Sequence, residues 1–162
     1  MIQKKSGKIN KKIAIVGGGP AGLTCAAFLA KAGAEVTIYE KNNYLGGLLV
    51  YGIPEFRLPK HIVKSTIQKI LDLGIEVKYN KKIGQDVTLK ELENKYDFVF
   101  LAFGANVSLK MGIEGEYLEG VYGANELLEY NCHPKYEGKT VLVNGGGNVA
   151  IDVARTVKRL GA

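Results

Sequence analysis

Two glycine-rich loops are the parts of this sequence whose residue types and spacing could support chemistry. The first, Gly17–Gly22, fits the pattern G-x-G-x-x-G. In that pattern the first glycine permits a tight turn, the second lets backbone approach a pyrophosphate, and the third lets a helix pack closely on a strand. A helix that starts there offers free N–H groups and the positive end of its dipole to phosphates. The loop therefore predicts a dinucleotide-binding site.

Glu40 adds to this prediction through its distance from the loop. It closes the apolar, β-branched run Glu35–Glu40, which is typical of a strand. A carboxylate about twenty residues after the glycine loop is placed to accept hydrogen bonds from the ribose hydroxyls of an adenosine. The alternative is a glycine-rich turn beside an ordinary surface glutamate. The complete strand–turn–helix–strand context makes that alternative the weaker one.

The second loop, Gly145–Ala150, repeats the pattern with alanine at the third glycine position. It again lies between a strand-like and a helix-like segment, so the two loops together predict two dinucleotides. A structural duplication with only one occupied site is the alternative. The residue that would separate NAD from NADP follows the next strand, beyond Ala162, and this choice stays open.

Other reactive residue types form no matching group. His61 and His133 are lone histidines that we expect at the surface, and no residue is assigned as catalytic. Cys25 and Cys132 are far apart and form no Cys-x-x-Cys pair. The spacing thus argues against a disulfide framework, a zinc or iron–sulfur site, and a dithiol mechanism, and we expect no metal.

The elements that must position the two loops follow from apolar periodicity. The pattern predicts a Rossmann-like, doubly wound α/β fold, with 41–59 as a long binding loop. The nearly all-apolar run Phe98–Phe103 suits a buried parallel strand. In the final helix we expect Val149, Val153 and Val157 to be exposed. Strands are predicted at 13–16, 35–40, 75–79, 98–103 and 140–143. Helices are predicted at 23–32, 89–94, 124–130 and 149–160, and one more after Pro59 that Gly74 ends.

Composition excludes several classes of protein. Hydrophobic residues make up 46% and charged residues 23%, as in globular proteins. The net charge of +6 comes from lysines that are spread along the chain without a recognition motif, so we expect no nucleic-acid partner. No apolar run approaches the roughly 20 residues that span a bilayer, and no signal peptide is evident. We therefore expect a cytoplasmic protein with no membrane partner.

Two longer segments carry a resemblance to a known family. They are the loop from Tyr44 to Lys60, Tyr-Leu-Gly-Gly-Leu-Leu-Val-Tyr-Gly-Ile-Pro-Glu-Phe-Arg-Leu-Pro-Lys, and Gly145–Arg155, followed by Arg-Leu-Gly-Ala from Arg159. With the glycine loops, they resemble the flavoproteins with two dinucleotide-binding domains, most closely the glutamate synthase small (beta) subunit group. The resemblance covers nearly the whole chain from Lys11 onward.

The resemblance implies an FAD-binding domain followed by the start of an NAD(P)H-binding domain. Gly46 and Gly47 would lie beside the flavin and pyrophosphate, backbone of Ile83 would meet the adenine, and Gly104 would pass near the flavin. The implied FAD contacts are Gly17, Gly19, Pro20, Ala21, Gly22, Leu23, Glu40, Lys41, Gly46, Gly47, Leu48, Arg57, Ile83 and Gly104. The implied contacts to NADPH (or NADH) are Gly145, Gly146, Gly147, Asn148 and Val149.

The implied activity is transfer of electrons from NAD(P)H through FAD to another acceptor, with a partner subunit or iron–sulfur centre as the acceptor. A ferredoxin:NADP oxidoreductase subunit is one alternative, and an FAD-binding structural or regulatory module is another. We expect a basic tail at 1–12, an FAD-binding part at 13–108, a connection at 109–138 and a truncated NAD(P)H-binding part at 139–162. The family's iron–sulfur domain and returning flavin segment are not found, so we expect an incomplete, inactive piece of such an enzyme.

Overall fold

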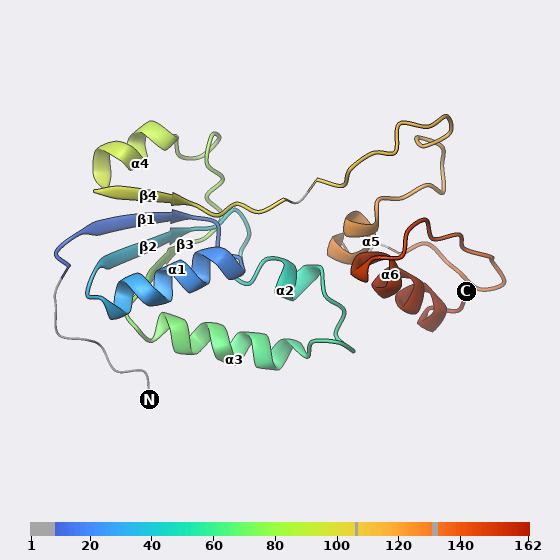
Figure 1. Cartoon of the computed structure of the whole chain (residues 1–162), viewed down its shortest axis with the longest axis horizontal. Coiled ribbons are helices and arrows are strands. Elements are labelled where there is room, and N and C mark those ends of the chain that lie inside the picture. Colours follow the sequence, from blue (N-terminus) through green and yellow to red (C-terminus); the bar gives the residue numbers. More distant parts are fainter. Residues whose placement is uncertain (1–8, 106, 131–132) are drawn as a thin grey trace. The chain divides into compact units, whose positions relative to one another are not determined.

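The computed structural model describes residues 9–105, 107–130 and 133–162. Most of the predicted basic tail and Cys132 lie outside these residues. The chain divides into two compact units (Figure 1). The first unit contains the residues up to Val50 together with Pro59–Gly104, and the second contains Tyr51–Leu58 together with Ala105–Ala162.

The first unit is built on a parallel sheet. Its strands are β1 (Lys12–Val16), β2 (Glu35–Tyr39), β3 (Glu76–Lys78) and β4 (Phe98–Leu101). They lie in the order β3-β2-β1-β4. Ile13 of β1 lies opposite Val36 of β2 and Phe98 of β4, which fixes the register. This order is that of doubly wound sheets, so the predicted fold class is confirmed.

Three helices cover the two faces of this sheet (Figure 1). Helices α1 (Pro20–Lys31) and α3 (Lys60–Leu71) share one hydrophobic cluster with the strands, and α4 (Leu89–Lys95) belongs to the other. Alternate strand residues point to opposite faces, which separates the two clusters. Ile13, Ile15, Val36 and Ile38 belong to the first cluster, while Ala14, Val16 and Tyr39 pack with Leu92 and Tyr96 in the second.

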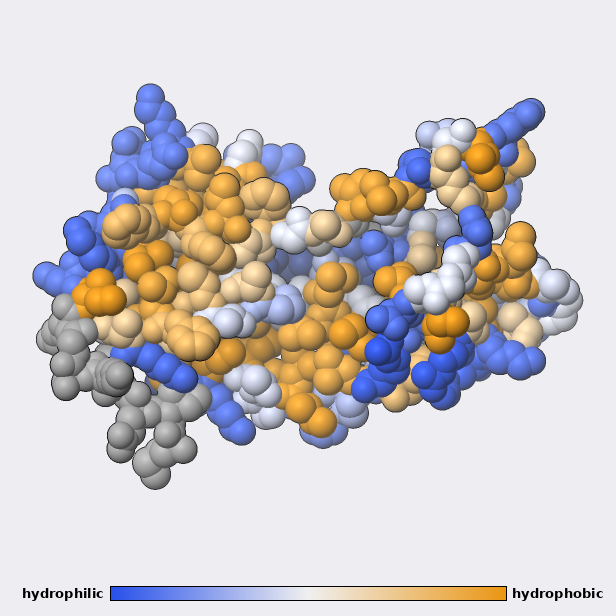
Figure 2. Space-filling view, in the orientation of Figure 1, coloured by the Kyte–Doolittle hydropathy of each residue, from blue (hydrophilic) through white to orange (hydrophobic). Residues whose placement is uncertain are grey.

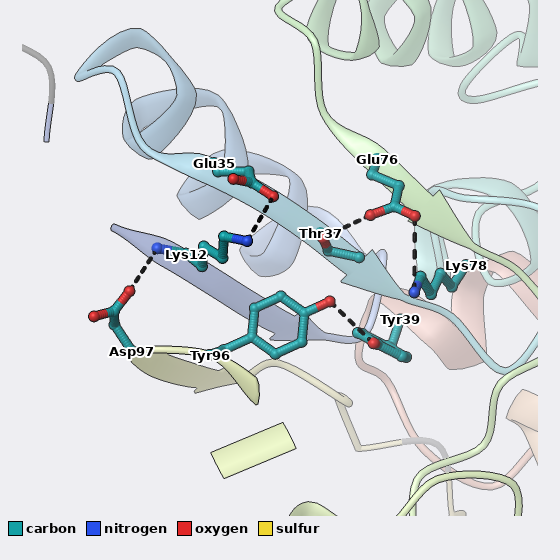
Figure 3. A network of polar contacts seen from close by, with 8 residues as sticks. All are labelled: Lys12, Glu35, Thr37, Tyr39, Glu76, Lys78, Tyr96 and Asp97. Atoms are coloured by element: carbon teal, nitrogen blue, oxygen red, sulfur yellow. Dashed lines mark hydrogen bonds and ion pairs between the residues drawn. The ribbon is translucent and has the colours of Figure 1, made fainter. Parts of the chain in front are cut away.

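Polar side chains on the α4 face join β2 to β3 and to the end of α4 (Figure 3). The hydroxyls of Tyr39 and Tyr96 lie 3.0 Å apart, and the Thr37 hydroxyl donates to Glu76 at 3.0 Å. Burial and the bond to Tyr96 raise the pKa of Tyr39 above its usual range. Tyr39 therefore stays protonated and acts as a structural hydrogen-bonding group.

The long segment between β2 and α3 differs from the expected irregular loop. Four of its residues form a short helix, α2 (Leu48–Tyr51). The N–H groups of Leu49 and Val50 donate to the carbonyl oxygens of Gly46 and Gly47. The glycines thus form a turn from which the helix starts, a feature too short for its apolar period to be recognised.

Strand β4 is parallel, as predicted, and pairs with β1, but the prediction that it is buried was wrong. The exposed fractions of Phe98, Phe100 and Leu101 are 61%, 42% and 50%. Among the described residues β4 pairs with no strand other than β1, so it forms an edge of the sheet. Helix α1 packs mainly on β1 and β2, and β4 contacts α4 on the opposite face. Figure 2 shows hydrophobic residues at the surface over the strands.

The second unit has two helices, α5 (Ala124–Tyr130) and α6 (Asn148–Arg159), around a small core. Leu127 and Tyr136 pack against Val153 and Val157, so the expected exposure of these two valines was wrong. Val149 is 43% exposed, as expected. The predicted strand at 140–143 is also wrong. A parallel strand exists only through bonds to a neighbour, and no described residue of this unit provides one.

None of the helices in the described part of the chain has the length and apolar character to cross a membrane.

Helix α4 begins with a capping box that gives a testable contribution to stability. The Thr88 hydroxyl accepts a hydrogen bond from the N–H of Glu91 at 3.2 Å, and the Glu91 carboxylate accepts one from the N–H of Thr88 at 2.7 Å. We expect Thr88→Ala to lower the free energy of unfolding by about 1 kcal/mol. Urea denaturation measures this loss, and Thr88→Ser, which keeps the hydroxyl, should restore most of it.

Candidate dinucleotide-binding site

The first site lies where the order of the strands reverses. The chain builds β1, β2 and β3 toward one side and then returns to place β4 on the other side of β1. Ligands of open α/β sheets bind at such a switch point, outside the carboxyl ends of the strands. Gly17 follows β1 there with a φ of +104°, and a Cβ on it would overlap the carbonyl oxygen of Ala102, just after β4. Gly104, with a φ of +75°, comes two residues later.

The glycines of the Gly17–Gly22 loop have different structural roles. A Cβ on Gly22 would overlap the carbonyl oxygen of Gly17, so this position holds α1 close to β1. A Cβ on Gly19 would meet nothing within 4 Å. Gly19 is also the N-cap of α1 and makes no side-chain cap, while Pro20 and Ala21 are exposed in the first turn. Of the three glycines that define the G-x-G-x-x-G pattern, Gly17 and Gly22 are thus needed for packing, and Gly19 faces open space at a helix N-terminus.

The Gly46–Gly47 turn lies directly against this loop. The Gly46 N–H donates to the Gly18 carbonyl oxygen at 2.8 Å, and a Cβ on Gly47 would stand 3.1 Å from the Cα of Gly19. Both turn residues have positive φ, +114° and +51°. The structure therefore brings together two glycine segments that sequence reasoning identified separately.

Glu40 connects the two segments. It is 6% exposed. Its Oε2 accepts a hydrogen bond from the Gly18 N–H at 2.7 Å, and its Oε1 accepts one from the Asn42 N–H at 2.9 Å. Sequence reasoning did not foresee this role in the protein itself. A carboxylate oxygen has more than one acceptor position, so these two bonds leave room for hydroxyl donors of a ligand.

The remaining predicted contacts of the first unit differ in exposure. Lys41 is exposed, and Leu48 is 41% exposed at the start of α2. Ile83 packs against the second hydrophobic cluster and pairs in a single bridge with Val87. Leu23 is 3% exposed, and its N–H donates to the Gly19 carbonyl oxygen, so both parts of Leu23 have partners inside the protein.

The second predicted loop has a similar geometry within its own unit. Gly145 has a φ of +123°, and a Cβ on it would lie 3.5 Å from the Cβ of Ala150. Cβ atoms on Gly146 and Gly147 would meet nothing within 4 Å. Gly147 is the N-cap of α6 without a side-chain cap, and Asn148 and Val149 are exposed in the first turn. The backbone N–H donors at the N-terminus of α6 therefore also face open space.

Arg57 lies in the second unit and has a protein partner there. Its Nη1 donates to Oδ2 of Asp152 at 2.7 Å, and the Asp152 side chain is only 5% exposed. Sequence reasoning missed Asp152. A carboxylate on the apolar face of a helix, between Val149 and Val153, was the signal that could have identified it.

The cysteine and histidines of the described residues do not form a reactive group. Burial raises the pKa of the Cys25 thiol, which reduces the fraction present as reactive thiolate. His61 is exposed, as expected. His133 is half-buried, with Nδ1 3.0 Å from the hydroxyl of Tyr136. No three metal-binding side chains gather within the part of the chain that the structure describes.

Curated relatives match nearly the whole chain. The chain is 47% identical, over 94% of its length, to the NADPH-Fe(3+) oxidoreductase subunit beta of Geobacter sulfurreducens. It is 39% identical, again over 94% of its length, to the glutamate synthase [NADPH] small chain of Escherichia coli. It spans 24% and 35% of the lengths of these two proteins.

A solved structure shows a similar fold. FprA from Mycobacterium tuberculosis in complex with NADPH matches with a TM-score of 0.76 and 30% identity, over 90% of this chain and 36% of FprA. Residues 11–162 match the family described as pyridine nucleotide-disulphide oxidoreductase. The match covers the β1 strand, both glycine loops and helix α6, and the chain belongs to this family.

Proposed function

We propose that this chain binds FAD in its first unit and NAD(P)H in its second, as part of an oxidoreductase that passes electrons from NAD(P)H to another acceptor. The observation that carries the proposal is the contact between Gly17–Gly22 and Gly46–Gly47 at the switch point of the sheet. In this proposal residues 13–108 contribute to FAD binding, and residues 139–162 begin the NAD(P)H-binding part.

The residues of the first unit fit an FAD pyrophosphate. Gly19 leaves the space that a phosphate needs, and the uncapped first turn of α1 provides N–H donors and the positive end of the helix dipole. Glu40 holds the loop and keeps acceptor positions for ribose hydroxyls. FAD, when bound, supplies the electron-accepting ring, and the chain binds and orients it.

The second unit offers a matching site for a nicotinamide dinucleotide. The open Gly146–Gly147 backbone and the uncapped N-terminus of α6 would receive its pyrophosphate. The names of both curated relatives include NADPH, and FprA was solved with NADPH, so we propose NADPH as the donor.

The acceptor is proposed to be a partner subunit. The two curated relatives are named as a subunit beta and as a small chain, which supports a multi-subunit enzyme. Among the two, the glutamate synthase small chain also matches the resemblance carried by the loops at 44–60 and 145–155. We therefore propose a role like that of the glutamate synthase small subunit.

Paired valine substitutions test the two sites separately. In the full-length protein we expect Gly19→Val to abolish FAD binding with the fold intact, because its Cβ meets no protein atom within 4 Å and its side chain fills the proposed phosphate position. Gly146→Val should weaken NADP⁺ binding and leave FAD binding unchanged. Flavin content after purification and calorimetric titration measure the two effects. Normal flavin content in Gly19→Val would contradict the assignment of the first loop.

A further inference from the structure

The sequence contains three arginines, and all three make contacts in one small region of the second unit. Arg57 pairs with Asp152 at 2.7 Å. Arg155 and Arg159 lie over the ring of Phe56, with their Cζ atoms 4.6 and 4.1 Å from the ring centre. Helix α6 therefore contacts both members of the neighbouring pair Phe56 and Arg57.

The positions on α6 explain this arrangement. Asp152, Arg155 and Arg159 are spaced i, i+3, i+7, so they lie on one face of the helix. A guanidinium over an aromatic ring is attracted to its negative face, and Phe56 receives two such contacts. The segment Tyr51–Leu58 is thus held on α6 at consecutive residues by two kinds of interaction.

Asp152 depends strongly on Arg57. Its carboxylate is buried, and its Oδ1 has no hydrogen-bond partner among the described residues. A buried charge without a partner is costly, so the bond from Arg57 to Oδ2 is the contact that compensates this carboxylate. Arg57 depends less on Asp152, since its side chain is 39% exposed and water can also solvate its charge.

We propose that Asp152 is a positioning residue that fixes the Arg57 guanidinium, while Arg155 and Arg159 fix the adjacent Phe56. The proposal deepens the proposed function and rests on it, because Arg57 is one of the FAD contacts that the family resemblance implies. A guanidinium has five N–H donors in a rigid fork. Asp152 engages Nη1 and thereby restricts the orientation of the whole planar group.

The test uses Asp152→Asn in the full-length protein, without added nucleotide. We expect the ¹⁵N–¹H signal of the Arg57 side chain to move to the position of a free arginine. Amide hydrogen exchange of residues 51–58 should become roughly tenfold faster, the lower range expected for loss of a hydrogen bond to a charged group. Asp97→Asn is the matched control, because Asp97 also forms a 2.7 Å ion pair, with Lys11, in the first unit. It should change neither observable.

Two outcomes would overturn the proposal. In one, Asp152→Asn leaves both the Arg57 signal and the exchange of residues 51–58 unchanged. In the other, exchange becomes faster with an unchanged Arg57 signal, which would mean that Asp152 acts only on the stability of α6. If helix α6 unfolds in Asp152→Asn, the same exchange measurement on Arg57→Gln tests the proposal. Faster exchange of 51–58 with α6 intact supports the proposal, and unchanged exchange overturns it.

These measurements need no cofactor. A failure of the positioning role is therefore distinguishable from a failure of the proposed function, which the Gly19→Val and Gly146→Val titrations test.

Discussion

Glu40→Ala is expected to lower both the stability of the first unit and its affinity for FAD. The substitution removes the acceptor for the N–H groups of Gly18 and Asn42. Leaving the buried Gly18 N–H unpaired costs about 1–3 kcal/mol, and the part-buried Asn42 N–H adds less because water can reach it. The ribose contacts proposed for the same carboxylate are also lost, and FAD affinity should fall by about one to two powers of ten.

Two variants separate these effects. Chemical denaturation measures the loss of stability, and fluorescence titration with FAD measures the loss of affinity. Glu35→Ala is the control, because Glu35 is exposed and forms only a 3.9 Å ion pair with Lys12 (Figure 3). Glu40→Gln keeps one oxygen acceptor and should lie between wild type and Glu40→Ala. Unchanged stability in Glu40→Ala would show that the two backbone bonds are not important for the loop.

Hydrogen bonds to the Asp97 carboxylate make part of the stability of the first unit depend on pH. Bonds from Lys11 and from the Lys12 N–H lower the pKa of Asp97 in the folded chain. The contribution of Asp97 to stability is therefore fully present at a pH above the pKa that Asp97 has in the unfolded chain. It is lost as the pH falls through the lower pKa that Asp97 has in the folded chain.

The elements near the first glycine loop were predictable because local patterns and tertiary contacts agree there. Ile13–Val16 and Glu35–Tyr39 are β-branched runs that become central strands. The burial of strand β4 could not be predicted from the sequence. Its apolar residues indicate a buried strand, but burial depends on what covers both faces, and a run of Phe, Val and Leu carries no information about that.

The predicted site residues were recognised by their type, while their internal partners were not. Glycines at fixed offsets report a backbone requirement directly, so the loops at Gly17 and Gly145 could be identified without a structure. The bond from Glu40 to Gly18 and that from Arg57 to Asp152 join residues far apart in the sequence. Such pairs follow from the folded geometry, and the predicted roles of Glu40 and Arg57 toward FAD stay predictions.

Gly22→Ala is expected to destabilise the first unit, although alanine favours helices. Gly22 lies in the first turn of α1, where the higher helix propensity of alanine would stabilise by at most about 1 kcal/mol. Against this, the new Cβ would overlap the carbonyl oxygen of Gly17 and stand 3.2 Å from Cγ2 of Ile15. Both neighbours are fixed, one by the turn after β1 and the other by the buried core.

Relief of this overlap requires α1 to move away from β1, which loosens the contacts of Leu23 and Ala26 with the core. Overpacking of this kind typically costs about 1–3 kcal/mol, so the packing effect exceeds the gain in propensity. Gly19→Ala is the matched control in the same loop, because its Cβ meets nothing within 4 Å and its φ is −78°. Guanidinium denaturation of both variants measures the difference. Equal stability of Gly22→Ala and Gly19→Ala would mean that the close packing of α1 on β1 does not limit this position.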